Sequence, residues 1–287
     1  MARVVLITGC SSGIGLETAL AFARAGDTVC ATMRNLSRVE KLQEAANAEG
    51  LKLALYELDV AKPKSFAALV DKVVREFGGV DVLVNNAGVL PIGAFEDESE
   101  FDLRNVMEIN FFGPALLTQA VLPTMREREG GYIINISSLS GMASKGGDAT
   151  YAASKFALEG LCEGYRNEIA RWNIKTALVE PGQYATNIFR DSGEEASPEH
   201  RSAYYEYNKW LQKSMQEGAG GGNSPRALAE LIVKISNSDG SRLRWAADNT
   251  AEHVMKAVFA QSDSERGEFL RGVADMDWWI EGQDTPE

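Results

Sequence analysis

The sequence predicts an α/β fold in which a doubly wound, parallel sheet of seven strands is covered by helices on both faces. Two observations predict this fold. Short apolar runs alternate with helical patterns along the chain, and glycine or polar motifs follow the ends of most of the apolar runs. Right-handed crossovers connect units of this kind. A chain of 287 residues is long for one domain, but α/β folds of this size often have a single core, so we predict one domain over residues 1–287.

The expected strands are apolar and rich in β-branched residues, which is typical of buried parallel strands. They cover residues 3–8, 28–33, 52–58, 81–84, 131–137, 174–180 and 243–247. Helical periodicity fills the intervals, at 14–25, 36–49, 63–77, 101–127, 151–172 and 224–237. Ligands of open parallel sheets bind beyond the carboxyl ends of the strands. We therefore expect the motifs that follow those ends to converge on one rim.

The first expected strand leads into a glycine-rich turn. The turn reads Thr8-Gly9-Cys10-Ser11-Ser12-Gly13-Ile14-Gly15, and a helical pattern follows it. A strand, a glycine turn and a helix together form a phosphate site, because glycine lets the backbone come close and free N–H groups at the helix start attract an anion. The spacing Gly-x-x-x-Gly-x-Gly departs from the G-x-G-x-x-G fingerprint, so a plain tight turn is the alternative.

The end of the second expected strand indicates which dinucleotide binds. An NAD enzyme usually carries an acid about 20 residues after the glycine turn, where it binds the ribose 2′-OH. No acid stands there in this chain, and the strand ends in Met33-Arg34-Asn35. A guanidinium suits a 2′-phosphate, so the sequence predicts NADP(H) rather than NAD(H). The alternative is a solvated arginine at a strand end.

Tyr151 and Lys155 lie four residues apart in an expected helix, and they therefore share one face. An ammonium about 4 Å from a phenol would contribute roughly 4 kcal/mol at an effective dielectric of ~20, enough to lower the phenol pKa by up to ~3 units. Such a tyrosine can act as general acid or base toward an alcohol oxygen. Ser138, at the end of a strand, could hydrogen-bond the same oxygen, with Ser137 as its rival. A Tyr-x-x-x-Lys pair alone is more often structural: the tyrosine packs against the protein and the lysine amine is solvated.

Together these motifs resemble the short-chain dehydrogenase/reductase family. The glycine turn and the segment Ala31-Thr32-Met33-Arg34-Asn35-Leu36 are similar to its 17β-hydroxysteroid-dehydrogenase-like branch. The matching elements follow the family's order between residue 3 and about residue 190: Thr8-Gly9-x-x-x-Gly13-Ile14-Gly15, Asp59-Val60, Asn85-Asn86-Ala87-Gly88, Asn110, Ser138, Tyr151-x-x-x-Lys155 and Pro181-Gly182-x-x-x-Thr186. The resemblance implies a Rossmann fold and an NADP(H)-dependent oxidoreductase that transfers a hydride between the nicotinamide and a carbonyl or secondary alcohol.

The resemblance also implies a role for each matching residue. Tyr151 would be the general acid/base, and Lys155 would lower its pKa and hold the nicotinamide ribose. Ser138 would orient the substrate oxygen, and Asn110 would fix the helix backbone and a water, unless it is a buried structural amide. The implied cofactor contacts are Gly9, Ser11, Ser12, Gly13, Ile14, Gly15, Arg34, Asp59, Val60, Asn86, Ala87, Gly88, Tyr151, Lys155, Pro181, Gly182 and Thr186. Asp59 would accept from the adenine amine, with a helix N-cap as its alternative role, and Thr186 would bind the carboxamide.

Other functions on the same fold are a non-catalytic NADP(H) sensor and a lyase or dehalogenase variant. Family members that act as sensors usually lack the tyrosine or the lysine, and this chain has both. The lyase and dehalogenase variants have a broken glycine turn, which is intact here. The sequence therefore favours the oxidoreductase and leaves the sensor as the alternative.

The composition indicates which binding partners are excluded and in which cellular compartment the protein is expected. The net charge of −12 argues against nucleic acid or an anionic membrane as the main partner. Three cysteines and two histidines form no disulfide or metal-binding spacing, so we expect no metal. The first strand begins at residue 3 and no apolar run reaches membrane-spanning length, which predicts a cytoplasmic protein. The helix at 151–172 resembles the family's dimer element, which implies a homodimer or a homotetramer.

Two segments are additions to the predicted core. Residues 187–223 form a long, aromatic-rich connection that ends in a run of glycines, and we interpret it as a helical lid over the cleft for a bulky apolar substrate. The alternative is a surface excursion whose aromatic side chains pack down. The C-terminal extension, residues 250–287, contains Trp278-Trp279-Ile280. These side chains favour burial, on the same chain, in the cleft or on another subunit.

Overall fold

A computed structural model of the chain describes residues 2–184, 202–220, 222–262, 265, 268–269, 272, 275 and 277–283. Its centre is one seven-stranded sheet in the order β3-β2-β1-β4-β5-β6-β7, with every neighbouring pair parallel. The strands are β1 Val4–Ile7, β2 Thr28–Met33, β3 Leu53–Glu57, β4 Val82–Asn85, β5 Gly131–Ile136, β6 Ile174–Glu180 and β7 Arg244–Ala246. This confirms the predicted doubly wound Rossmann fold, whose strand order reverses direction between β1 and β4.

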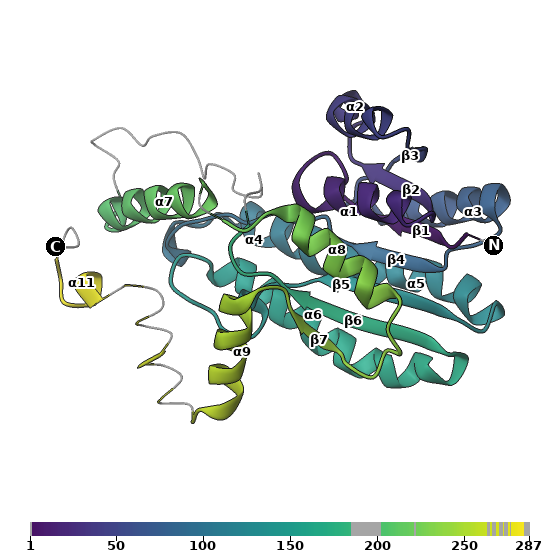
Figure 1. The fold of residues 1–287 in the computed structure, drawn as a ribbon. Coiled ribbons are helices and arrows are strands. Elements are labelled where there is room, and N and C mark those ends of the chain that lie inside the picture. The colour runs from purple at the N-terminus through teal and green to yellow at the C-terminus, as the bar shows by residue number, and fades with distance from the viewer. Residues whose placement is uncertain are drawn as a thin grey trace.

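Helices cover both faces of the sheet (Figure 1). On one face lie α1 Gly13–Arg24, α2 Glu40–Ala48 and α8 Pro225–Ser236, and on the other α3 Phe66–Phe77, α5 Gly113–Glu127 and α6 Ala149–Ile169. Successive residues of β1 enter different layers, because side chains alternate along a strand. Val5 and Ile7 pack with the first layer, whereas Val4 and Leu6 pack with the second. This double burial explains why the strand sequences are continuously apolar.

The helix expected over 101–127 is divided in the structure. It consists of α4 Glu100–Met107, a π-helical segment η4 Glu108–Phe112, and α5. The π turn is followed by Gly113 and Pro114, and the proline has no N–H to continue an α-helical ladder. Asn110 lies inside this segment and is fully buried. Short 3₁₀ turns also flank other helices, at η1 Leu36–Arg38, η2 Pro63–Ser65, η3 Phe95–Asp97, η5 Leu139–Gly141 and η6 Ala170–Trp172.

The two predicted additions lie beyond the sheet, at the left of Figure 1. Within the proposed lid the structure describes a helix, α7 Tyr205–Gly220, while residues 185–201, Thr186 among them, fall outside the described residues. The extension contributes α9 Asn249–Ala260 and a short helix, α11 Asp277–Ile280, which lies beside α7. No helix in the described ranges is both long and apolar enough to cross a bilayer.

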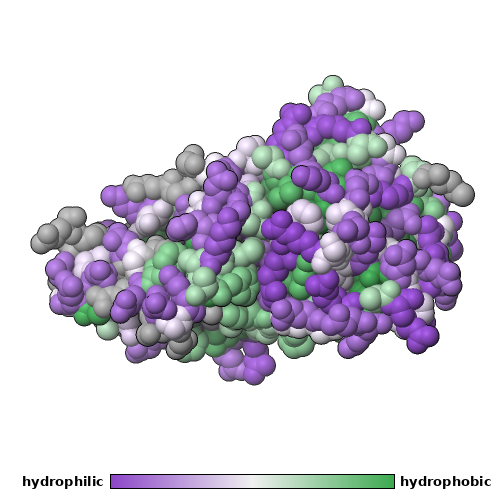
Figure 2. Space-filling view, turned by 60° about the horizontal axis from the view of Figure 1, so that its bottom comes forward, coloured by the Kyte–Doolittle hydropathy of each residue, from purple (hydrophilic) through white to green (hydrophobic). Residues whose placement is uncertain are grey.

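One face of the molecule carries hydrophobic residues in its centre with hydrophilic residues on both sides (Figure 2). Single large apolar side chains are also exposed on several helices. They include Phe101 on α4, Phe156 on α6, Phe259 on α9 and Ile280 on α11. Isolated exposed apolar residues are ordinary on a monomer surface. The predicted homodimer therefore stays a prediction.

Candidate functional site

A cavity of about 1220 Å³ lies at the carboxyl edge of the sheet. Its walls come from the turn after β1 and from the ends of β2, β3, β4, β5 and β6, together with the first turns of α6. The predicted site residues that line it are Gly9, Ser11, Ser12, Gly13, Ile14, Gly15, Arg34, Asp59, Val60, Asn86, Ala87, Gly88, Ser138, Tyr151, Lys155, Pro181 and Gly182. Segments far apart in sequence thus meet on one rim, as the strand-end argument predicted.

The glycine turn lies tightly against the loop that follows β4. Asn86 Nδ2 donates to the carbonyl oxygen of Thr8 at 2.8 Å, and a Cβ on Gly15 would lie 2.3 Å from the carbonyl oxygen of Gly9. Gly9 itself has a φ of +75°, which favours glycine. Ser12 precedes α1 without forming a side-chain cap, so its hydroxyl does not occupy the first N–H groups of the helix. These donors face an anion-sized space, and the turn therefore fits a dinucleotide phosphate.

At the far end of the same wall, Arg34 is exposed, and no described residue forms an ion pair or hydrogen bond with its guanidinium. Arg38 and Lys41 line the cavity beside it. The positive charge that the net-acidic chain needs for an anionic ligand is thus gathered at this end. Asp59 lines the cavity, and its side chain also contacts its own turn: Oδ1 accepts from Ala61 N at 3.1 Å, and Oδ2 lies 3.2 Å from Lys62 Nζ. The residue before the next helical turn is Lys62, so Asp59 is not a helix N-cap.

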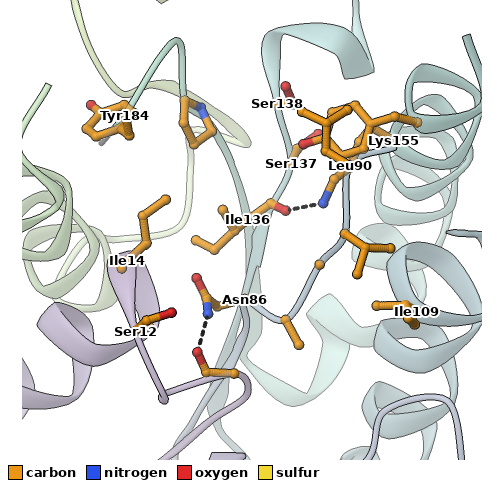
Figure 3. Close-up of a pocket in the computed structure, with 18 of the residues that line it drawn as sticks. Ser12, Ile14, Asn86, Leu90, Ile109, Ile136, Ser137, Ser138, Lys155 and Tyr184 are labelled. Carbon is orange, nitrogen blue, oxygen red and sulfur yellow. Dashed lines mark hydrogen bonds between the residues drawn. The ribbon is translucent and has the colours of Figure 1, made fainter. Parts of the chain in front are cut away.

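Tyr151, Lys155 and Ser138 occupy the other end of the cavity. Figure 3 shows Lys155 and Ser138 there. Burial raises the pKa of Tyr151 to about 12, although its hydrogen bond with Ser138 acts in the opposite direction. Burial also lowers the pKa of Lys155 to about 8. Lys155 Nζ donates to the carbonyl oxygen of Ile136 at 2.8 Å and lies 5.6 Å from the centre of the Tyr151 ring.

The expectation that Lys155 brings the phenol pKa towards neutrality is therefore wrong for this arrangement. The helix does place both side chains on one face, but the amine donates to the Ile136 carbonyl (Figure 3), and Lys155 is not among the groups that shift the phenol pKa. Desolvation penalises the phenolate more than any neighbouring charge favours it. The predominant form of Tyr151 at neutral pH is the protonated phenol.

Asn110 does not line the cavity. Its Oδ1 accepts from Val89 N at 2.9 Å, and its Nδ2 donates to the carbonyl oxygen of Val89 at 2.9 Å and to Ser154 Oγ at 3.1 Å. It thereby ties the loop after β4 to α6, as a buried structural amide does. Of the two rival serines, Ser137 is 3% exposed and Ser138 is half-buried. Because Ser138 forms the hydrogen bond with Tyr151, the geometry favours Ser138.

Several wall residues at the tyrosine end were not foreseen. Leu90, Met215 and Val254 give this end an apolar character, and Val254 shows that the C-terminal extension reaches the cleft. Asp148 lies three residues before Tyr151 and accepts from Ser140 Oγ at 2.6 Å. Burial raises the pKa of the Asp148 carboxyl. An acid just ahead of the helix was visible in the sequence, but its burial depends on residues distant along the chain.

The tryptophans of α11 dock on α7 of the same chain. Trp278 is 5% exposed and lies 5.4 Å from Trp210 between ring centres, and Trp279 lies 5.3 Å from Tyr207. We call these four side chains with Tyr204, which is 5.8 Å from Trp279, the aromatic clasp. Trp278 and Tyr207 belong to the same apolar cluster as Tyr151. Of the placements left open for the tail, the structure shows docking on the same chain.

Comparisons with known proteins found one matching family model and several similar proteins. A family model described as short chain dehydrogenase matches residues 3–197. The chain is similar to retinol dehydrogenase 8 of Bos taurus, with 39% identity over 84% of this chain and 80% of the relative. A solved short-chain dehydrogenase from Streptomyces avermitilis has a TM-score of 0.78 and 34% identity, over 98% of both chains. A metagenomic short-chain oxidoreductase in complex with NADP has a TM-score of 0.67 and 25% identity, over 85% of this chain and 95% of that one.

Proposed function

The chain belongs to the short-chain dehydrogenase/reductase family, and from this we propose that it is an NADP(H)-dependent oxidoreductase that interconverts a carbonyl and a secondary alcohol. The observation that carries the proposal is one cavity that joins a glycine turn at one end to Tyr151, Ser138 and Lys155 at the other. The proposal covers one domain over 1–287, with α7 as part of a lid. The cytoplasmic location stays a prediction.

The cavity residues fit a dinucleotide. The helix start after the glycine turn would hold the phosphates, Arg34 the 2′-phosphate, and the backbone at Asn86, Ala87 and Gly88 the adenosine. Lys155 would hold the nicotinamide ribose, and Pro181 and Gly182 line the same end. Thr186, proposed for the carboxamide, lies outside the described residues. When bound, NADP(H) supplies or accepts the hydride.

We propose that Tyr151 gives a proton to the carbonyl oxygen and that Ser138 donates a second hydrogen bond to it. Because the pKa of Tyr151 is raised to about 12, the phenol holds its proton through the physiological range. The protonated phenol is the form that can give a proton to a carbonyl oxygen. Lys155, with a pKa lowered to about 8, remains mostly charged at neutral pH.

The substrate is proposed to be bulky and apolar. Leu90, Met215 and Val254 line the cavity at the tyrosine end, and α7 and α11 close an apolar cluster around Tyr151. The name of the bovine relative, retinol dehydrogenase 8, points in the same direction, since retinol is a large apolar alcohol. A homodimer is proposed through α4, η4 and α6, where Phe101, Phe112 and Phe156 are exposed.

The deciding experiment follows the loss of NADPH absorbance, with NADH in parallel, against a mixed panel of ketones, quinones and aldehydes. We expect turnover with NADPH in the wild type and a loss of about 10²–10⁴-fold in Tyr151→Phe, with NADPH binding nearly unchanged. Tyr184→Phe is the matched control, because Tyr184 also lines the cavity but donates to the Ala247 carbonyl at 3.0 Å. Substantial turnover in Tyr151→Phe would remove this residue from the acid role. Tight NADPH binding without turnover on a broad panel would favour the sensor.

A further inference from the structure

A group of buried ionisable side chains lies behind the tyrosine end of the cavity, and the proposed reaction uses none of them. Glu159 is on α6 and is 4% exposed, and Glu180 ends β6 and is fully buried. Arg244 begins β7, and its Nε donates to Glu159 Oε2 at 2.8 Å, while its Nη1 donates to Glu163 Oε1 at 2.9 Å. Buried carboxylates are costly, so their retention here calls for a physical reason.

Glu159 lies one helical turn after Lys155. The two side chains are each 4% exposed and therefore share the buried face of α6. Residues four apart on a helix are neighbours, and Glu159 Oε1, unlike the Oε2 that pairs with Arg244, has no hydrogen-bond partner among the described residues. The Lys155 amine is fixed at the end of β5 by the Ile136 carbonyl, next to Ser137. The carboxylate thus faces the same strand end as the amine.

The Glu159 carboxylate also supports the loop that carries Ser138. A Cβ on Gly141 would lie 2.6 Å from Ser137 Oγ and 3.2 Å from Glu159 Oε1. The hydroxyl and the carboxylate therefore both lie against Gly141, the last residue of the turn η5, which follows Ser138 directly. A substitution at Glu159 would act on Lys155 by charge and on the Ser138 loop by packing. The test must separate the two effects.

The charges around this group leave Glu159 as the anion that acts on Lys155. Burial raises the pKa of Glu180 to about 9, with a further rise from Glu159, so Glu180 is neutral at pH 7. Burial raises the pKa of Glu159, whereas the positive charge and the hydrogen bond of Arg244 lower it. Arg244 thus favours the ionised form of Glu159. The charge of Asp148 raises the pKa of Tyr151 and is not among the charges that act on Lys155. The Glu159 charge raises the pKa of Lys155, against the burial that lowers it.

We propose that Glu159 is a positioning residue, whose buried carboxylate keeps the Lys155 amine charged and directed to the end of β5. This inference rests on the proposed function, because it is the family role of Lys155 that gives the charge a purpose. Without the carboxylate, only desolvation would act, and a smaller share of the amine would be charged near pH 7. Lys155 would then be a weaker cationic partner for the ribose.

The direct test is an NMR titration of Lys155 in protein labelled with ¹³C,¹⁵N-lysine, with the resonance assigned by its loss in Lys155→Met. We expect the wild-type pKa near 8 to fall by about half a unit or more in Glu159→Gln, and to stay within about 0.2 units in Glu159→Asp, which keeps the charge. Glu163→Gln is the matched control, because Glu163 contacts the same arginine from an exposed position. An unshifted Lys155 in Glu159→Gln, or an equal shift in Glu163→Gln, would overturn the proposal.

If Glu159→Gln does not fold, the double variant Glu159→Gln/Arg244→Gln removes both charges of the buried pair and is compared with Arg244→Gln alone. We expect a lower Lys155 pKa in the double variant, and equal values would overturn the proposal. In the active enzyme, the basic limb of kcat/KM for carbonyl reduction should move to lower pH in Glu159→Gln, because losing a negative charge lowers the pKa of Lys155 and of Tyr151 alike. An unmoved limb would count against the proposal. If the proposed function is wrong, the wild type will show no turnover. The NMR titration would still test the effect of Glu159 on Lys155, because it does not depend on turnover.

Discussion

At the scale of single residues, Arg34 is expected to decide between two cofactors. Its exposed guanidinium has no carboxylate partner among the described residues, so it is available to a 2′-phosphate. The substitution Arg34→Asp removes the guanidinium that would bind the 2′-phosphate and puts a negative charge in its place, which repels the phosphate. We expect kcat/KM with NADPH to fall by about 10–100-fold while the value with NADH changes little, since hydrogen bonds to charged groups contribute roughly 1.5–3 kcal/mol. The ratio of the two kcat/KM values is the measurement.

Arg38 supplies the control for that prediction, because it lines the same end of the cavity. Arg34→Gln and Arg38→Gln remove one positive charge each and add none. The prediction requires the larger change of ratio in the Arg34 variant. A larger effect at Arg38 would assign the 2′-phosphate to that residue instead.

The site could be predicted residue by residue where chemistry follows from spacing, and not where it follows from burial. The four-residue interval between Tyr151 and Lys155 correctly placed both on one helical face. The direction of the Tyr151 pKa was wrong, because the phenol is enclosed by Leu90, Tyr207 and other residues distant in sequence. Desolvation is a property of the folded environment, so no local pattern announces it.

At the scale of elements, the aromatic clasp joins the end of the chain to the proposed lid. Trp278 and Trp279 contact Trp210, Tyr207 and Tyr204 with ring centres 5.3–5.8 Å apart. Aromatic pairs contribute about 0.5–1.5 kcal/mol each beyond the area that they bury. Since Trp278 and Tyr207 also pack in the cluster that contains Tyr151, the clasp holds α7 over the reacting end of the cavity.

Loosening the clasp should therefore affect the substrate more than the cofactor. In Trp278→Ala/Trp279→Ala we expect KM for a bulky apolar carbonyl to rise by roughly 10-fold, the equivalent of one lost aromatic contact. KM for NADPH should change little, because the glycine turn lies at the other end of the cavity. Ile280→Ala is the matched control, since Ile280 is on the same helix but 55% exposed. Equal rises for substrate and cofactor would show a general loss of structure instead.

Helices and strands were predictable where they depend on local sequence, and not where they depend on contacts with distant residues. The seven strands follow from apolar runs, and their observed bounds lie within about two residues of those expected. The division of 101–127 was not visible in the periodicity, although Pro114 stands just after the π segment. Asn110, inside that segment, contacts Val89 and Ser154, which are distant along the chain. The docking of α11 was not visible either, since its tryptophans indicated only that they would be buried.

At the scale of the whole molecule, the buried acid Glu180 should make stability depend on pH. Burial raises its pKa to about 9, from the ordinary glutamate value of 4.5. Between these values the unfolded chain releases the proton and the folded protein keeps it, so the free energy of unfolding falls as pH rises, by at most about 1.4 kcal/mol per pH unit. In Glu180→Gln this contribution is lost. We expect urea unfolding at pH 5.5 and 7.5 to show a smaller fall in the variant than in the wild type. Glu163→Gln, 56% exposed, should retain the wild-type slope. Equal slopes in all three proteins would mean that Glu180 is ionised in the folded state.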